Sequence, residues 1–201
     1  MSKIMYTEVL RTTNIDEYKK KEQEFIVLND KTKSMMTTNF RKVTFKSDQI
    51  CAIDYSIVYE DFQNVYIEQK SKDDNVVTKE LIPITKEQAN SILEGDLQFL
   101  ADSDDNRLQA FYMKMTTLGL KPAYRKEFTR KTFHQNRFLD IIFDMSMTRK
   151  PYEKNDLFAP RKFGFKADYS NLRMSIRHNL VASKSLEQLL AFEKSLMDST
   201  L

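Results

Sequence analysis

Acidic and basic side chains occur two residues apart in the stretch 65–72, where residue types alternate as in a β-strand. Period-two alternation places Glu68 and Lys70 on the same face of such a strand. Lys79, on the predicted returning strand, joins this face if the register brings it opposite. The pair is either a solvated cross-strand ion pair or part of a barrel lining. In a lining, Lys70 would bind phosphate oxygens and Glu68 would hold a divalent ion or orient the lysine.

A second group of charges lies between residues 121 and 137. Arg125 and Arg130 stand out, because a guanidinium group can bind two phosphate oxygens at once. Alternation places Lys126 and Arg130 on one face of a strand, and Arg125 and Lys131 on the other. Repeated arginines on neighbouring strands suit a polyanion, whereas a basic outer face of the protein would have the same residue types.

Two pairs of carboxylates have spacings that a metal site could use. Asp140 and Asp144 share one face of a predicted strand, which would meet either a divalent ion or solvent. Glu22 and Glu24 would form a second metal platform on a strand but would diverge on a helix. The local sequence fits both a helix that begins after Asn14 and a strand that begins near Glu22, so both interpretations stay open.

Composition excludes several classes of function. The 201 residues carry a net charge of only +3, so the whole chain is not a nucleic-acid-binding polycation. Three glycines cannot build a glycine-rich phosphate loop. Cys51 forms no internal disulfide, and neither His134 nor His178 has the context of a catalytic triad. Without a signal peptide or an apolar stretch of membrane-spanning length, a cytoplasmic location or one within a viral particle is expected.

The alternating stretches predict an antiparallel meander. We therefore predict the α+β class, an antiparallel β-barrel or tunnel with packed helices, as a single domain of residues 1–201. Strands are expected at residues 37–45, 50–60, 65–72, 76–84, 121–133 and 137–147. Phe40, Val43 and Phe45 are candidate inward residues, and residues 1–13 receive no assigned structure.

Helices are predicted between the strands and near the C-terminal end. Thr85 and Gln88 have the spacing of a capping box, and Gly95 lies where a left-handed residue ends a helix. Residues 107–118 carry apolar side chains at helical spacing. An amphipathic helix at about residues 184–198 is expected to pack on the barrel or against a partner.

Several of these segments together resemble the vacuolar transporter chaperone (VTC) domain of polyphosphate polymerases. The resemblance covers about residues 60–148. It rests on the segments 65–70, 77–80 and 85–95, and on the order and spacing of Pro122, Arg125, Phe128, Arg130, Phe133 and Asp144.

The VTC family has the triphosphate tunnel fold, a barrel whose lumen is lined by lysine and arginine and holds a glutamate-bound metal. The resemblance thus implies a site for the phosphates of a nucleotide or of polyphosphate, with Mn²⁺ or Mg²⁺. The phosphate-binding residues it implies are Lys70, Lys79, Arg125 and Arg130, and the metal-binding residues are Glu68 and Asp144. The implied reaction passes the terminal phosphoryl group of ATP to a growing chain, by charge neutralisation and alignment.

The sequence departs from the family pattern at charged positions. Residues 52–57 lack the basic residues of the family's early strand, and Asp140 replaces an arginine on the strand that ends in Asp144. The glutamates at positions 22 and 24 are not followed by the lysine that tunnel enzymes use. An incomplete lining neutralises a triphosphate poorly, so the fold could persist without the chemistry.

Two functions follow from these observations. The chain is either a tunnel protein that binds a polyanion, with polyphosphate polymerase or triphosphatase activity, or a catalytically degenerate VTC-like module. The second would serve as a structural subunit of a larger assembly such as a phage or viral particle. The expected partners are a phosphate-rich small molecule, polyphosphate or assembly subunits, rather than a membrane or a specific nucleic acid.

Overall fold

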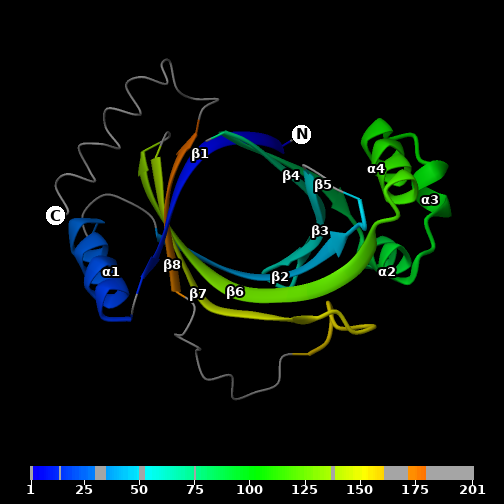
Figure 1. Cartoon of the computed structure of the whole chain (residues 1–201). Coiled ribbons are helices and arrows are strands. Elements are labelled where there is room, and N and C mark those ends of the chain that lie inside the picture. The colour runs from blue at the N-terminus through cyan, green and yellow to red at the C-terminus, as the bar shows by residue number, and fades with distance from the viewer. Residues whose placement is uncertain are drawn as a thin grey trace.

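A computed structural model describes residues 2–13, 15–29, 35–49, 53–74, 76–136, 139–160 and 172–179. Within these ranges the strands close into an antiparallel barrel in the order β1-β5-β4-β3-β2-β6-β7-β8 (Figure 1). The strands are β1 (Ser2–Thr13), β2 (Met35–Lys46), β3 (Ile53–Glu60), β4 (Asn64–Asp73), β5 (Val76–Ile84), β6 (Lys121–Asn136), β7 (Leu139–Pro151) and β8 (Leu172–Asn179). The predicted α+β barrel with packed helices is therefore confirmed.

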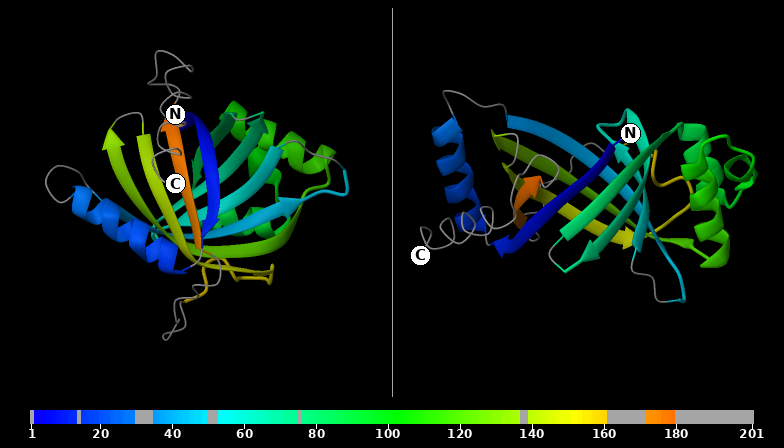
Figure 2. Two further views of the ribbon diagram at one scale, coloured as in Figure 1. Left: turned by 60° about the vertical axis from the view of Figure 1, so that its left-hand side comes forward. Right: turned by 90° about the horizontal axis from the view of Figure 1, so that it is seen from above.

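The helices lie outside the barrel on two opposite sides (Figures 1 and 2). One side carries α1 (Ile15–Asn29), and the other carries α2 (Lys86–Glu94), α3 (Gln98–Ala101) and α4 (Asn106–Thr117). Because each helix has an apolar face to bury, the outer face of the barrel wall must be apolar beneath it.

Two apolar cores fill the spaces between the helices and the barrel wall. Phe111 of α4 packs against Phe45 and Tyr55 of β2 and β3, with ring centroids 6.4 and 5.8 Å away. On the other side Tyr18 of α1 meets Phe143 of β7 edge-on at 5.1 Å. Since successive strand residues point to opposite faces, the residues between these apolar positions face the lumen. The barrel is therefore packed mainly from outside, which leaves room for polar side chains in its interior.

The inward residues expected of β2 are divided between the two faces. Val43 and Phe45 are buried in the core beneath α2, α3 and α4. Phe40 instead lies on the lumen side, where its ring stacks on Phe128 of β6 at 5.0 Å. An odd spacing separates Phe40 from Val43, so the expectation that all three point the same way was wrong.

The two interpretations left open for residues 22 and 24 are decided in favour of the helix, because these residues belong to α1. Side chains two positions apart on a helix project in different directions. Glu24 instead pairs with Lys21, one turn away, at 3.2 Å. The helix that begins after Asn14 is thus the correct one of the two alternatives. Its amphipathic pattern is weak, and Tyr18 provides its buried anchor.

Several element boundaries differ from the predictions. Residues 1–13 received no assignment, yet β1 completes the barrel between β5 and β8. The connection expected at residues 134–136 is part of β6, and β7 continues to Pro151. The amphipathic helix at about residues 184–198 and Cys51 lie outside the described residues.

The capping residues of α2 match their prediction. The Thr85 hydroxyl accepts a hydrogen bond from the Gln88 backbone N–H at 3.1 Å, and the Gln88 side chain accepts one from the Thr85 N–H at 2.9 Å. Gly95 ends the helix with φ +87°, a left-handed conformation that favours glycine. Local sequence alone thus defines where this helix begins and ends.

We expect Thr85→Ala to lower the free energy of unfolding by about 1 kcal/mol, because it removes one half of the capping box. Urea unfolding followed by circular dichroism measures this loss. Thr85→Ser keeps the hydroxyl and should retain most of the stability. Equal stability of the alanine and serine variants would contradict the role of the cap.

Candidate functional site

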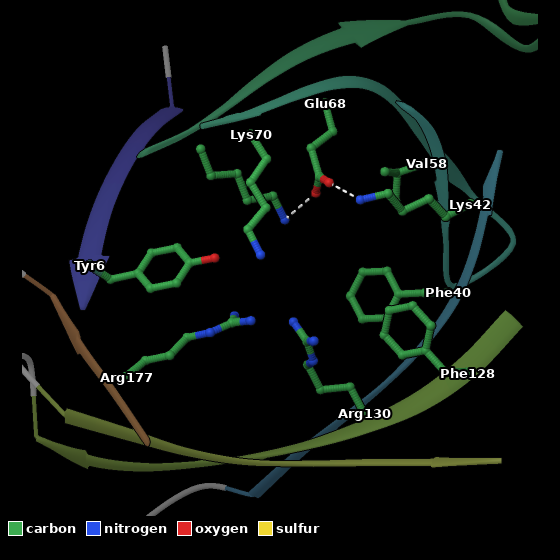
Figure 3. Close-up of a pocket in the computed structure, with 10 residues that line it drawn as sticks. Tyr6, Phe40, Lys42, Val58, Glu68, Lys70, Phe128, Arg130 and Arg177 are labelled. Atoms are coloured by element: carbon green, nitrogen blue, oxygen red, sulfur yellow. Dashed lines mark hydrogen bonds and ion pairs between the residues drawn. The ribbon is translucent and has the colours of Figure 1, made fainter. Parts of the chain in front are cut away.

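The lumen contains a cavity at which side chains from seven of the eight strands converge (Figure 3). Strand register explains the convergence, since directly paired residues on neighbouring strands share a face. For example, Lys70 of β4 pairs with Lys79 of β5, and both point inward. The residues that line the cavity are Tyr6, Phe40, Lys42, Val58, Glu68, Lys70, Lys79, Phe128, Arg130 and Arg177. The lining is thus dominated by cations.

Glu68 lies at the centre of one cationic cluster. Its carboxylate forms ion pairs with the ammonium groups of Lys42 and of Lys79, the latter at 2.7 Å. Burial alone would raise the pKa of Glu68, but the two lysines outweigh it and hold the pKa well below its usual range. Glu68 is therefore ionised and neutralises part of the lysine charge.

Arg130 is the cation that the protein holds most firmly. Its guanidinium donates two hydrogen bonds to the Asp144 carboxylate, at 2.6 and 2.8 Å. It also lies over the rings of Phe40 and Phe128, 5.4 and 5.3 Å from their centroids. Burial opposes the charge, yet the hydrogen bonds and charge of Asp144 raise the pKa of Arg130. Its charge is fixed in place before any ligand arrives.

Arg177 of β8 and Glu8 of β1 form the opposite wall. The Arg177 guanidinium donates to Glu8 at 2.8 Å and lies 4.7 Å from the centroid of the Tyr6 ring. The Tyr6 hydroxyl points into the cavity (Figure 3). Burial raises the pKa of Tyr6, so the phenol remains a hydrogen-bond donor at neutral pH.

Lys70 is the cavity cation with the loosest partner. Its ammonium lies 3.9 Å from Glu8, while its side chain is 32% exposed. Burial lowers the pKa of Lys70, and the nearby charges of Lys42 and Arg177 lower it further against the opposing effect of Glu8. An added anion would relieve this repulsion.

The charges of the site do not cancel. Five cations line the cavity, and their carboxylate partners are Glu8, Glu68 and Asp144. The group therefore carries a net charge of about +2 when all are ionised. Partial neutralisation makes the cations tolerable in the interior and leaves attraction for a polyanion.

The structure brings most of the sequence-predicted site residues together. Lys70, Lys79, Arg130 and Glu68 surround one cavity, and Asp144 supports Arg130 from the neighbouring strand β7. The sequence left open whether Glu68 and Lys70 form a solvated pair or line the barrel. Their shared face points into the lumen. Asp144 contacts a guanidinium here, in contrast to the metal expected for it.

Arg125 does not lie with the other predicted residues. It pairs with Asp156 at 2.7 Å and with Glu127 at 3.4 Å, on the outer face of β6. Arg41 pairs with the same Glu127 at 3.3 Å and donates to the Leu157 carbonyl at 3.2 Å. The assignment of Arg125 to the lumen was wrong, because its odd spacing from Arg130 places it on the opposite face of β6, which pairs with β2 without a register shift over these residues. Arg125 and Arg41 instead attach the chain near residue 157 to the barrel.

Asp140 and Asp144 do not form a pair. Asp140 contacts His134 at 2.6 Å, whereas Asp144 is engaged by Arg130. Four residues along a strand span about 13 Å, so one ion cannot bridge both carboxylates.

Sequence reasoning missed three residues that line the cavity and one carboxylate, Glu8, that pairs with two of its cations. Lys42 supplies the cation that seemed absent from residues 52–57, from the preceding strand β2. The other three come from strands that are not among those predicted above: Arg177 from β8, and Tyr6 and Glu8 from β1. The even spacing of Tyr6 and Glu8 could have suggested a shared strand face, but nothing local indicates that β1 and β8 are neighbours.

A metal held by protein groups alone does not fit the described residues. They contain no group of three or more aspartate, glutamate, histidine or cysteine side chains that could hold a metal ion. The lumen carboxylates are engaged separately, Glu68 by two lysines and Asp144 by an arginine. A divalent ion that prefers several oxygen ligands would need most of them from a phosphate ligand.

Comparison with known proteins agrees with the fold. The VTC domain family model matches residues 55–193, which is most of the chain. The chain therefore belongs to the VTC domain family, as its resemblance over residues 60–148 suggested. No curated protein matches the sequence.

Solved structures with the same fold include three proteins of distant sequence. A protein of Bacillus halodurans assigned as an adenylate cyclase matches with TM-score 0.62 and 10% identity, over 99% of this chain and 91% of its own. A Hippeastrum protein assigned as an adenylyl cyclase, with a dominant triphosphatase activity, matches with TM-score 0.59 and 9% identity, over 98% and 87%. The Mimivirus capping enzyme triphosphatase matches with TM-score 0.54 and 10% identity, over 100% and 88%. At these identities the likeness establishes the triphosphate tunnel fold.

Among the helices that the structure describes, none is both long and apolar enough to cross a membrane.

We expect Glu68→Gln to lower the free energy of unfolding by roughly 3 kcal/mol at pH 7, because two buried lysines lose their carboxylate. The folded-state pKa of Glu68 is depressed, so its stabilising contribution is present above the pKa of the unfolded state, about 4.3. This contribution is lost as the pH falls below that value. Urea unfolding at pH 7, 5, 4 and 3 should show the difference between wild type and variant shrinking below about pH 4.3. A difference that stays constant over this range would contradict the ion-pair assignment.

Proposed function

We propose that this chain binds the phosphate chain of inorganic polyphosphate or of a nucleoside triphosphate inside its barrel. The observation that carries the proposal is the convergence of five cations on one cavity. Lysine and arginine are the side chains that bind phosphate oxygens, and the net positive charge of the site favours a multiply charged anion. Membership of the VTC family and the triphosphatases among the similar structures support the same ligand class.

The cavity residues have distinct uses in such a complex. Arg130 is preorganised by Asp144 and presents fixed positive charge without the cost of ordering a flexible side chain. Lys70 is loosely paired and can turn toward a phosphate oxygen. The Tyr6 hydroxyl points into the same space (Figure 3) and would donate a hydrogen bond to a phosphate oxygen there. Lys42 and Lys79 share Glu68, which limits their mutual repulsion before the ligand enters.

Phosphoryl transfer is the reaction that this arrangement would serve. The bond between the γ-phosphorus and the bridging oxygen of ATP breaks as an acceptor oxygen attacks, and ADP leaves. With a terminal phosphate of polyphosphate as acceptor the chain grows by one unit, and with water as acceptor inorganic phosphate is released. The cations would act by neutralising and aligning the transferred group, which needs little covalent chemistry from the protein.

Mg²⁺ or Mn²⁺ enters this proposal as a complex with the phosphate ligand. Such ions are commonly bound through one or two carboxylates together with substrate phosphates. The cavity supplies cations of its own for initial binding. The alternative role as a structural subunit of a phage or viral particle receives no support from the family match or from the similar structures.

Binding is tested by isothermal titration calorimetry with tripolyphosphate. We expect Lys70→Ser to weaken binding about tenfold, because a charged hydrogen bond to phosphate is lost. Lys114→Ser on the outer helix α4 removes the same charge from an exposed position and should leave the dissociation constant within about twofold. Failure of the wild type to bind tripolyphosphate or polyphosphate would overturn the proposal.

The Arg125→Gln variant tests whether Arg125 acts on the outer face of β6 or in the lumen. It removes the 2.7 Å ion pair with Asp156, so we expect a loss of about 1–3 kcal/mol in the free energy of unfolding. The dissociation constant for tripolyphosphate should remain within about twofold of wild type, since the side chain lies outside the cavity. A large loss of binding by the folded variant would instead place Arg125 in the ligand site.

Metal dependence and catalysis are tested together. We expect tripolyphosphate to bind in the presence of EDTA, because the cavity is cationic without a metal. Incubation with ATP and Mg²⁺ or Mn²⁺ then separates the activities, since released inorganic phosphate indicates hydrolysis and long chains on a gel indicate polymerisation. Binding without either product would limit the function to recognition of the polyanion.

A further inference from the structure

Three cations lie directly opposite one another on neighbouring strands at one end of the cavity. Lys42 of β2 pairs with Lys126 of β6, and Lys126 pairs with Arg149 of β7. Directly paired residues share a face, and Lys42 lines the cavity, so all three belong to the lumen side. Like charges in this arrangement destabilise a sheet, which is unfavourable unless an anion neutralises them.

The outer two cations of this row lack acidic partners. In the part of the chain that the structure describes, neither Lys126 nor Arg149 forms an ion pair with a carboxylate, in contrast to the cavity cations. The ring of Tyr124 contacts both, with its centroid 3.9 Å from the Arg149 guanidinium and 5.4 Å from the Lys126 ammonium. Asp54 at the same end is exposed and pairs loosely with Lys46 at 3.9 Å. The row is therefore left with an excess of positive charge.

The row lies toward one mouth of the barrel. Lys126 is four residues from Arg130 along β6, a distance of about 13 Å along a strand, in the direction of the end at which β6 begins and β7 finishes. The other mouth has the opposite character, because β3 ends there with Glu60 followed by Asp61. Burial raises the pKa of Glu60, and the charge of Asp61 adds to this effect against the opposing charges of Lys79 and Arg130. The two ends of the tunnel thus differ in charge.

We propose that Lys126 and Arg149, held by Tyr124 and continued inward by Lys42, form a second phosphate subsite that receives the further units of an inorganic polyphosphate chain. This inference rests on the proposed function, because it assumes that one end of the chain occupies the cavity near Arg130. The chain then leaves through the mouth at the beginning of β6, while Glu60 and Asp61 repel it at the opposite mouth. A ligand of three phosphates fills the cavity, and a longer one also engages the row.

The test compares two ligands on the same variants. Dissociation constants for tripolyphosphate and for long-chain polyphosphate are measured by calorimetry at several salt concentrations. We expect Lys126→Ser and Arg149→Ser each to weaken binding of the long chain about tenfold and of tripolyphosphate by no more than about twofold. The slope of log affinity against log salt should fall for the long chain alone, because one phosphate contact is removed.

Controls separate charge, folding and location. Lys114→Ser on α4 removes the same charge from the outside and should change neither affinity. Lys126→Arg and Arg149→Lys keep the charge and should retain the preference for the long chain. If Lys126→Ser does not fold, the exposed Arg149 tests the subsite by itself.

The possible outcomes are distinct. Equal weakening of both ligands, or unchanged binding of the long chain, would overturn the second subsite while leaving the cavity as the phosphate site. If wild type binds neither ligand, the proposed function itself fails.

Discussion

The structure depends on the partial neutralisation of cations inside a closed barrel. Removing several lysines and arginines from water is costly, and that cost is reduced only where carboxylates lie close to them. Glu68 forms ion pairs with two lysines, Asp144 with Arg130, and Glu8 with Arg177. Three carboxylates among five cations leave an interior that is stable enough to fold and still positively charged.

This balance requires the apolar core to lie elsewhere. Most of the buried hydrophobic side chains of the strands point outward, beneath α1 on one side and beneath α2, α3 and α4 on the other. The helices therefore take the place that a packed interior has in a small filled barrel. Because the lumen carries little of the hydrophobic core, its residues can be arranged for ligand binding at a smaller cost to stability.

The cations of the central cavity and those at the mouth of the tunnel differ in how far carboxylates neutralise them. Within the cavity each cation has a carboxylate nearby, whereas the row that continues through Lys126 to Arg149 lacks such partners among the described residues. A polyanion would meet unneutralised charge at the mouth and partly neutralised charge further in. Electrostatic attraction is then strongest where a charged ligand first arrives, which is the arrangement that favours capture from solution.

The sequence by itself determined what depends on neighbouring residues. The alternation of β4 placed Glu68 and Lys70 on one face, and Thr85, Gln88 and Gly95 defined α2. Family resemblance indicated the barrel. Alternation placed Arg125 and Arg130 on opposite faces of one strand without saying which face is inside. The resemblance implied both for the lumen, whereas Arg125 contacts Asp156 outside. The cavity also depends on contacts of β1 with β8 and of β2 with β6, which join strands far apart in the chain. Only the tertiary structure could bring Arg177 to Glu8 and Lys42 to Glu68, because barrel closure selects strand neighbours through packing of the whole chain rather than through local sequence.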